Sequence, residues 1–115
     1  MVHHMKLHEQ PFAHIACGQK TIELRLNDEK RQRIQIGDEI IFSMSSSPLS
    51  QIRVLVTALH RFTNFRELYS SLPLDRCGYL PHELPSASAK DMEKYYSSDE
   101  QHKYGVLGIE FKVIA

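Results

Sequence analysis

A long strand pattern near the middle of the chain limits the possible folds more than any other feature. Apolar and polar residues alternate from Ile52 to Phe62, which is the period-two pattern of a β-strand with one buried face. Such strands are typical of antiparallel sheets, in which one face packs on the core and the other meets water. The residues expected on a single face of this strand are Val54, Val56, Ala58, His60 and Phe62.

Shorter segments on either side complete the expected order of elements. Pro11 and Gly18 mark the start and the end of a helix over 10–17, and Asn64 with Glu67 forms a capping pattern for a helix over 64–72. Four further strands are predicted, at 5–7, 21–26, 39–44 and 104–114, together with a short apolar alternation at 34–36. Residues 45–50 are expected to form a polar loop. A third helix is predicted at 88–96, capped by Ser88, and Ser98 with Gln101 forms a smaller cap pattern. Few strands alternate with long helices, which argues against a doubly wound parallel sheet. We therefore predict an α+β, mainly β domain, a small antiparallel sheet curled into a barrel with helices at its side.

The length and the charge balance restrict the class of partner. A chain of 115 residues accommodates one domain, 1–115. Its 14 Lys and Arg residues balance 14 Asp and Glu residues, which excludes a coat of positive charge as the basis for nucleic-acid binding. The charges are unevenly divided, because residues 1–66 hold nine Lys and Arg against six Asp and Glu, whereas residues 67–115 hold five against eight. A modest positive groove survives if the cations of the first part share a face.

The sequence also predicts a compartment. No apolar run approaches the ~18 residues of a membrane span, and the first residues include no apolar stretch of signal-peptide length. We therefore expect no membrane partner and a cytoplasmic location. Cys17 and Cys77 do not form a CxxC motif, and two free thiols suit the reducing cytosol. His3 and His4 are set aside as candidate tag residues, with Met5 as the natural start.

The densest group of polar residues follows the first predicted helix. Lys20 precedes a strand on which Thr21, Glu23 and Arg25 are expected to project to one face. A compact lysine cation and a planar, bidentate arginine suit an anion or a polarised carbonyl, and a glutamate between two cations favours its ionised form. The alternative is a solvated sheet face with weak cross-strand ion pairs. The spacing alone favours this alternative.

Other groups of residues give weaker chemical signals. Lys30, Arg31 and Arg33 suit phosphate contacts, although an ordinary charged loop is the more common meaning of such a run. His14 and Cys17 are three residues apart, which is too weak a signal for a metal site, so we predict no metal and no cofactor. Candidates for stacking on exposed bases are Tyr95, Tyr96, Tyr104 and His102, for which core packing is again the more common use. Residues 73–88 contain three prolines and are expected to be mostly loop, and the sequence leaves open whether they close over a site.

The run Gly18-x-Lys20-x-x-Glu23-x-Arg25 resembles the signature of the ASCH domain, a family of the PUA-like superfamily. The resemblance extends from Leu7 to Val113 and continues in Leu26-x-Asp28-Glu29-Lys30-Arg31, Gly37-Asp38-x-Ile40-x-Phe42, Phe65-x-Glu67-Leu68 and Lys103-Tyr104-Gly105-Val106. It implies a PUA-like β-barrel of about five to six strands with flanking helices, and a cleft beside the barrel that binds RNA or a nucleotide-like ligand. The resemblance implies that Lys20, Glu23 and Arg25 line this cleft. With the other signals added, the candidate ligand-binding residues are Gly18, Lys20, Glu23, Arg25, Lys30, Arg31 and Tyr104.

One ASCH branch is similar to a different class, the amidohydrolases that deacetylate N4-acetylcytidine. These use a lysine, a threonine nucleophile three residues later and a distant glutamate. Lys20 matches the lysine, but Glu23 occupies the position of the threonine, and Thr21 follows the lysine by one residue rather than three. Asp75 or Glu67 matches the distant acid only loosely. The alternative function is therefore a small amidohydrolase acting on a modified nucleoside, with Lys20 and Glu23 as candidate catalytic residues and Glu23 as a base for water.

Overall fold

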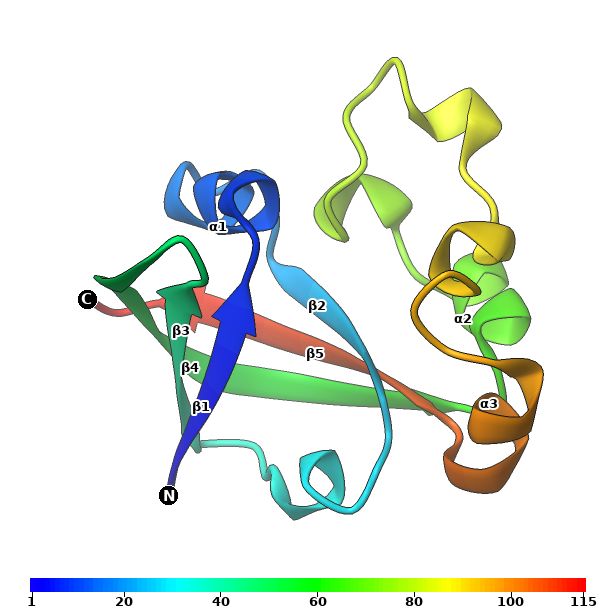
Figure 1. Cartoon of the computed structure of the whole chain (residues 1–115), viewed down its shortest axis with the longest axis horizontal. Coiled ribbons are helices and arrows are strands. Elements are labelled where there is room, and N and C mark those ends of the chain that lie inside the picture. Colours follow the sequence, from blue (N-terminus) through cyan, green and yellow to red (C-terminus); the bar gives the residue numbers. More distant parts are fainter.

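A five-stranded sheet with the strand order β1-β3-β4-β5-β2 forms the centre of the protein (Figure 1). The computed structural model describes every residue from 1 to 115. The strands are β1 (Val2–Leu7), β2 (Ile22–Leu26), β3 (Glu39–Met44), β4 (Ser47–Phe62) and β5 (Val106–Val113), and the α-helices are α1 (Glu9–Ala16), α2 (Phe65–Ser71) and α3 (Ser98–Tyr104). Only β1 and β3 pair in parallel, and every other pair is antiparallel. The prediction of an α+β domain with a curled, mainly antiparallel sheet is confirmed.

The first two helices begin and end near the residues that the sequence predicts. In α1, Phe12 and Ile15 are buried against the sheet, and Gly18 beyond its end has a φ of +85°, a conformation that favours glycine. At α2, the side chain of Asn64 accepts a hydrogen bond from the backbone N–H of Glu67 at 2.9 Å. Glu67 does not reach back to Asn64, because its carboxylate accepts from the hydroxyl of Thr63 instead, at 2.9 Å.

The strand β4 is longer than predicted. The polar segment 45–50 was expected to be a loop, but only residues 45 and 46 form the turn and Ser47 already belongs to β4. The polar composition misled the prediction because this end of the hairpin is exposed, so its strand residues need no apolar side chains. Residues 34–36, in contrast, form no strand, since Ile34 is buried after a 3-10 turn at 31–33 whereas Ile36 is exposed.

A bulge in β4 makes the prediction of a single apolar face wrong. The pairing of β4 with β5 shifts register between Val56 and Ala58, so that one extra residue reverses the alternation. Val54, Val56 and then Leu59 pack on one core, whereas Phe62 packs on another. The sheet therefore contributes side chains from both faces.

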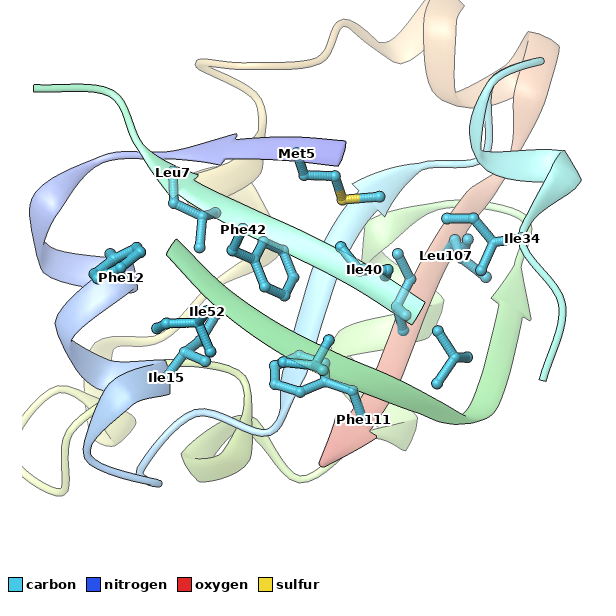
Figure 2. Close-up of a cluster of buried hydrophobic side chains, with 13 residues drawn as sticks. Met5, Leu7, Phe12, Ile15, Ile34, Ile40, Phe42, Ile52, Leu107 and Phe111 are labelled. Atoms are coloured by element: carbon cyan, nitrogen blue, oxygen red, sulfur yellow. The ribbon is translucent and has the colours of Figure 1, made fainter. Parts of the chain in front are cut away.

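Two hydrophobic cores lie on the two faces of the curled sheet. The larger core is drawn in Figure 2, where Phe12 and Ile15 of α1 approach Phe42 of β3 and Ile52 of β4. Phe42 also packs on Phe111 with ring centroids 5.5 Å apart. The second core gathers the apolar side chains of β2, α2 and residues 77–106: Ile22, Leu24, Leu26, Phe65, Leu68, Cys77 and Val106.

The chain between α2 and β5 is less helical than predicted. The helix expected over 88–96 is only a 3-10 turn at Ala89–Met92, although Ser88 and Asp91 do form the expected capping box. The cap of α3 is Ser97 with Glu100 rather than Ser98 with Gln101. Gln101 is instead buried, where its side-chain oxygen accepts from the N–H of Phe65 at 3.0 Å. None of the helices has the length and the apolar composition that crossing a membrane requires.

His3 packs within the fold, although it lies outside the cleft described below. It lies buried in β1, where its Nε2 is 2.8 Å from Oδ2 of Asp38. The same carboxylate accepts from the backbone N–H of Gln35 at 3.0 Å and from the terminal ammonium of Met1 at 3.3 Å. Asp38 thereby ties the start of β1 to the turn that precedes β3.

We expect Asp38→Asn to lower stability at neutral pH and to weaken the acid dependence of folding. The hydrogen bonds from His3 and from Gln35 lower the pKa of Asp38 to about 2. Because the folded-state pKa lies below the ordinary value of 3.8, the carboxylate stabilises the fold above about pH 4 and loses this effect as the pH falls towards 2. Urea midpoints at pH 7 and pH 3 measure the difference, with Asp75→Asn on the surface as the control. An equal loss of stability on acidification in wild type and Asp38→Asn would contradict this role.

Candidate functional site

A cleft of about 620 Å³ lies beside the free edge of β2, within the volume range of small-molecule sites. One wall comes from β1 and α1, and the other comes from Tyr69 of α2 and from residues 77–96. In Figure 1, β2 runs between α1 and this later segment. Residues 73–88, whose role was left open, thus contribute part of a wall, through Cys77, Gly78, Tyr79, Glu83 and Ser86.

Lys20, Glu23 and Arg25 meet in this cleft. The Lys20 ammonium lies 2.7 Å from Glu23 Oε1, and Arg25 Nε donates to Glu23 Oε2, also at 2.7 Å. Lys20 is 8% exposed and Glu23 is 4% exposed, so the alternative of a solvated sheet face is wrong. All three side chains line the cleft. We call them the Lys–Glu–Arg triad.

The glutamate of the triad is ionised. Burial by itself would raise the pKa of Glu23, but the charges and hydrogen bonds of Lys20 and Arg25 outweigh burial and lower the pKa to about 2. Both carboxylate oxygens of Glu23 are held by cations. Glu23 therefore positions the two cations and is a poor proton acceptor near neutral pH.

The cations of the triad keep donors for a ligand. A lysine ammonium has three N–H donors and a guanidinium has five. Lys20 bonds only to Glu23 through its side chain, and Arg25 spends one further N–H on the carbonyl of Lys6 at 3.0 Å. The remaining N–H groups of both side chains have no partner in the protein. They suit a phosphate or a carbonyl oxygen in the cleft.

Gly78 leaves room for the stem of Lys20. A Cβ at position 78 would lie 3.4 Å from Cδ of Lys20, and the φ of +109° at Gly78 is one that other residues rarely adopt. Three side-chain hydrogen bonds fix the loop 73–79 next to the triad. Gln19 donates to the carbonyls of Asp75 and Tyr79 at 2.9 and 3.0 Å, and Arg76 donates to the hydroxyl of Thr21 at 2.8 Å.

Aromatic side chains form much of the wall opposite α1. Tyr95 and Tyr96, both candidates from the sequence, line the cleft together with Tyr69 and Tyr79. Tyr96 also stacks on Phe65 with ring centroids 5.7 Å apart, whereas Tyr95 is 60% exposed. Sequence reasoning missed Tyr69 and Tyr79. Tyr69 follows Phe65 by four residues on α2, a spacing that indicates only a shared helix face, and Tyr79 stands in a loop without periodicity.

The hydroxyls of the tyrosine wall form a chain that ends on a carboxylate. Tyr79 donates to Oδ2 of Asp91 at 2.7 Å, and the hydroxyl oxygens of Tyr69 and Tyr79 lie 2.6 Å apart. Burial, the largest effect on both tyrosines, raises the pKa of Tyr69 to about 12 and that of Tyr79 further. Both hydroxyls therefore keep their protons at neutral pH.

Other residues singled out in the sequence lie outside the cleft. Gly18 provides the turn after α1, and Tyr104 ends α3, where it packs on the second core. Arg31 pairs with Asp28 at 3.1 Å. Lys30 donates to the carbonyl of His4 at 3.4 Å and is exposed. Of the candidate ligand-binding residues, the structure therefore brings together Lys20, Glu23 and Arg25.

The cysteine in the cleft is unsuited to nucleophilic attack. Burial raises the pKa of the Cys77 thiol to about 12, and the thiolate is the reactive form of cysteine. Cys17 lies apart from it on the surface. No group of three or more His, Cys, Asp and Glu side chains is placed to hold a metal ion.

The protein is a small domain in which a curled five-stranded sheet presents a buried ion-pair network beside one edge strand. The model of the ASCH domain matches residues 5–115. The chain belongs to the ASCH family, and its fold is of the PUA-like type.

Solved structures agree with this assignment. Hypothetical protein PH0355 is 31% identical with a TM-score of 0.81, and the alignment covers 99% of this chain and all of that one. Protein PF0455 from Pyrococcus furiosus is 30% identical over 99% of this chain and 98% of that chain, with a TM-score of 0.70. The ASCH protein from Zymomonas mobilis shares the fold at 18% identity and a TM-score of 0.64, over 98% of this chain and 70% of that one. No curated protein matches the sequence significantly.

Proposed function

We propose that this ASCH protein binds RNA or a nucleotide-like ligand in the cleft beside β2. The observation that carries the proposal is the Lys–Glu–Arg triad at the cleft, where two cations with unused N–H donors are fixed by one ionised glutamate. Preorganised lysine and arginine donors suit the oxygens of phosphates and base carbonyls. The tyrosines of the opposite wall offer rings on which a base can stack.

The charges of the cleft favour a short ligand over a long polyanion. Its lining contains four Lys and Arg residues and three Asp and Glu residues, so attraction is local rather than spread over a surface. Few phosphate contacts give a shallow salt dependence, close to one unit of slope per contact. We therefore expect a modest affinity that is set mainly by contacts inside the cleft and that falls only slowly as the salt concentration rises.

Titration of the four ribonucleoside monophosphates tests the proposal. Lys6→Gln removes a cleft cation whose side chain makes no internal hydrogen bond, and Lys112→Gln removes an exposed cation outside the cleft. We expect Lys6→Gln to weaken binding roughly three- to tenfold and Lys20→Met to weaken it roughly a hundredfold, since a charge-assisted hydrogen bond contributes ~1.5–3 kcal/mol. Lys112→Gln should bind as the wild type does. Circular dichroism establishes that each variant is folded, and equal affinity of Lys6→Gln, Lys20→Met and wild type would refute the cleft as the site.

Variants at Lys30 and Arg31 test whether the ligand is a single nucleotide or a single-stranded RNA. Both lie outside the cleft, at the loop that follows β2. If the physiological ligand is single-stranded RNA, these cations contact phosphates beyond the nucleotide in the cleft. Lys30→Gln is then expected to weaken binding of an eight-nucleotide RNA while leaving mononucleotide binding unchanged. Equal affinities of wild type and Lys30→Gln for the RNA would restrict the proposal to a nucleotide.

The geometry gives the amidohydrolase alternative little support. Glu23 has a pKa of about 2 and no free oxygen, which makes it a weak base for water. The hydroxyl of Thr21 is occupied by Arg76, and Thr21 does not line the cleft. Measuring acetate release from N4-acetylcytidine decides the matter. Turnover that disappears in Lys20→Met would favour the alternative over a purely binding role.

A further inference from the structure

The hydrogen-bond chain in the tyrosine wall has a fixed direction. The single hydroxyl proton of Tyr79 goes to the carboxylate of Asp91, so the hydroxyl oxygen of Tyr79 can only accept from Tyr69. The proton of Tyr69 is therefore also used within the wall. Asp91 fixes the far end of the chain, because its Oδ2 also accepts from the backbone N–H of Ser88 at 3.3 Å.

The Tyr69–Tyr79–Asp91 part of the wall consequently presents acceptors to the cleft, whereas Lys94 on the same side is a donor. The hydroxyl oxygen of Tyr69 keeps a lone pair, and Oδ1 of Asp91 has no partner in the protein. Glu83, which also lines the cleft, uses its Oε1 to accept from the N–H of Leu80 at 2.7 Å and adds a further carboxylate to this side. The triad across the cleft presents the opposite character, because Lys20 and Arg25 are donors only.

This opposition of donors and acceptors restricts the base that the cleft can hold. A ligand atom against Tyr69 and Asp91 must donate a hydrogen bond, whereas an atom against Lys20 and Arg25 must accept one. An exocyclic amino group is a donor, and the carbonyl that replaces it in the corresponding keto base is an acceptor. Two acceptors facing each other in a desolvated cleft are unfavourable, since neither regains the hydrogen bond it made to water.

We propose that the Tyr69–Tyr79–Asp91 chain makes the cleft selective for nucleotides whose base carries an exocyclic amino group. This inference rests on the proposed nucleotide binding and adds a class of base and three residues that determine specificity. The amino group lies at the tyrosine wall, and the phosphate or a base carbonyl lies at the triad. Uracil and hypoxanthine nucleotides, which place a carbonyl where the amino group stands, are discriminated against.

Two pairs of nucleotides in which a carbonyl replaces this amino group, and in which the neighbouring ring nitrogen gains a hydrogen, provide the test. Adenosine monophosphate is compared with inosine monophosphate, and cytidine monophosphate with uridine monophosphate, by calorimetric titration. We expect the amino nucleotide of each pair to bind roughly tenfold more tightly, the ratio that one misplaced hydrogen bond of ~1.4 kcal/mol produces. In Tyr79→Phe the proton of Tyr69 is released to donate to a carbonyl, so the preference should disappear or reverse. Tyr104→Phe removes a hydroxyl outside the cleft and should retain the preference.

The outcomes separate this inference from the function on which it rests. If both members of each pair bind equally and Lys20→Met weakens the binding of both, nucleotide binding stands and the selectivity is refuted. If none of the four nucleotides binds, the proposed function fails and the selectivity with it. Should Tyr79→Phe not fold, Asp91→Asn, which removes the carboxylate at the end of the chain, should lose the preference in its place. Retention of the full preference in a folded Tyr79→Phe or Asp91→Asn variant would refute the role of the chain.

Discussion

Glu23→Gln is expected to lower the free energy of unfolding by about 3–5 kcal/mol. Glu23 is 4% exposed and holds Lys20 and Arg25, both at 2.7 Å. A neutral amide would leave two cations close together in a desolvated place without a counter-charge, which costs much more than loss of a surface pair. Urea denaturation at pH 7 measures the change, provided that the m-value is unchanged.

The matched control for Glu23→Gln is Glu39→Gln. Glu39 pairs with Arg53 at 3.3 Å, but both side chains are about one-third exposed or more, so the expected loss is only about 0–1 kcal/mol. A loss in Glu23→Gln no larger than in Glu39→Gln would contradict the structural role of the triad.

The pH dependence of stability gives a second test of the role of Glu23. The pKa of Glu23 falls from the ordinary value of 4.5 to about 2 on folding. The carboxylate therefore contributes its stabilisation above about pH 4.5, and the contribution disappears as the pH falls towards 2. The difference in stability between wild type and Glu23→Gln should shrink over this window.

Phe42→Ala is expected to destabilise the fold by about 3–5 kcal/mol. Phe42 has no exposed surface, and it lies on β3 between β1 and β4 against the ring of Phe111. Removing the ring leaves a cavity that strands fixed by hydrogen bonds on both sides cannot close. Thermal and urea unfolding measure the loss, with Leu49→Ala as the control. Leu49 is 97% exposed, so its truncation should change stability by less than about 0.5 kcal/mol, and a similar effect of the two variants would contradict the position of the core.

The succession of strands along the chain and the first helices could be predicted because their signals are local, whereas the pairing of the strands could not. Alternation identified β2, β3 and most of β4, and the residues Pro11, Gly18 and Asn64 marked helix ends. The bulge after Val56 could not be predicted, because it depends on how β4 pairs with β5 rather than on the residues of β4 alone. The helix predicted over 88–96 failed for a related reason, since a good cap at Ser88 starts a turn but does not extend it.

The candidate site also combines residues that the sequence could indicate with residues that it could not. The triad comes from one short segment, so the sequence could indicate its members, although not that Glu23 would be buried. The tyrosine wall comes from α2 and from loops that meet only in the folded chain, so the partnership of Tyr69, Tyr79 and Asp91 left no periodic signal. Lys30 and Arg31 are close to the motif in sequence, yet the turn after β2 carries them away from the cleft.

The side chains that bridge β1 and the segment around β2 also affect how the protein behaves at high concentration. The outer edge of β1 exposes backbone carbonyls, and such an edge can recruit a strand from another molecule. Here Arg25 donates to the carbonyl of Lys6 and Lys30 donates to the carbonyl of His4. Two acceptors that an incoming strand would need are therefore already occupied by long, charged side chains. The contacts that hold the curled sheet together thus also protect β1 against intermolecular strand pairing and aggregation.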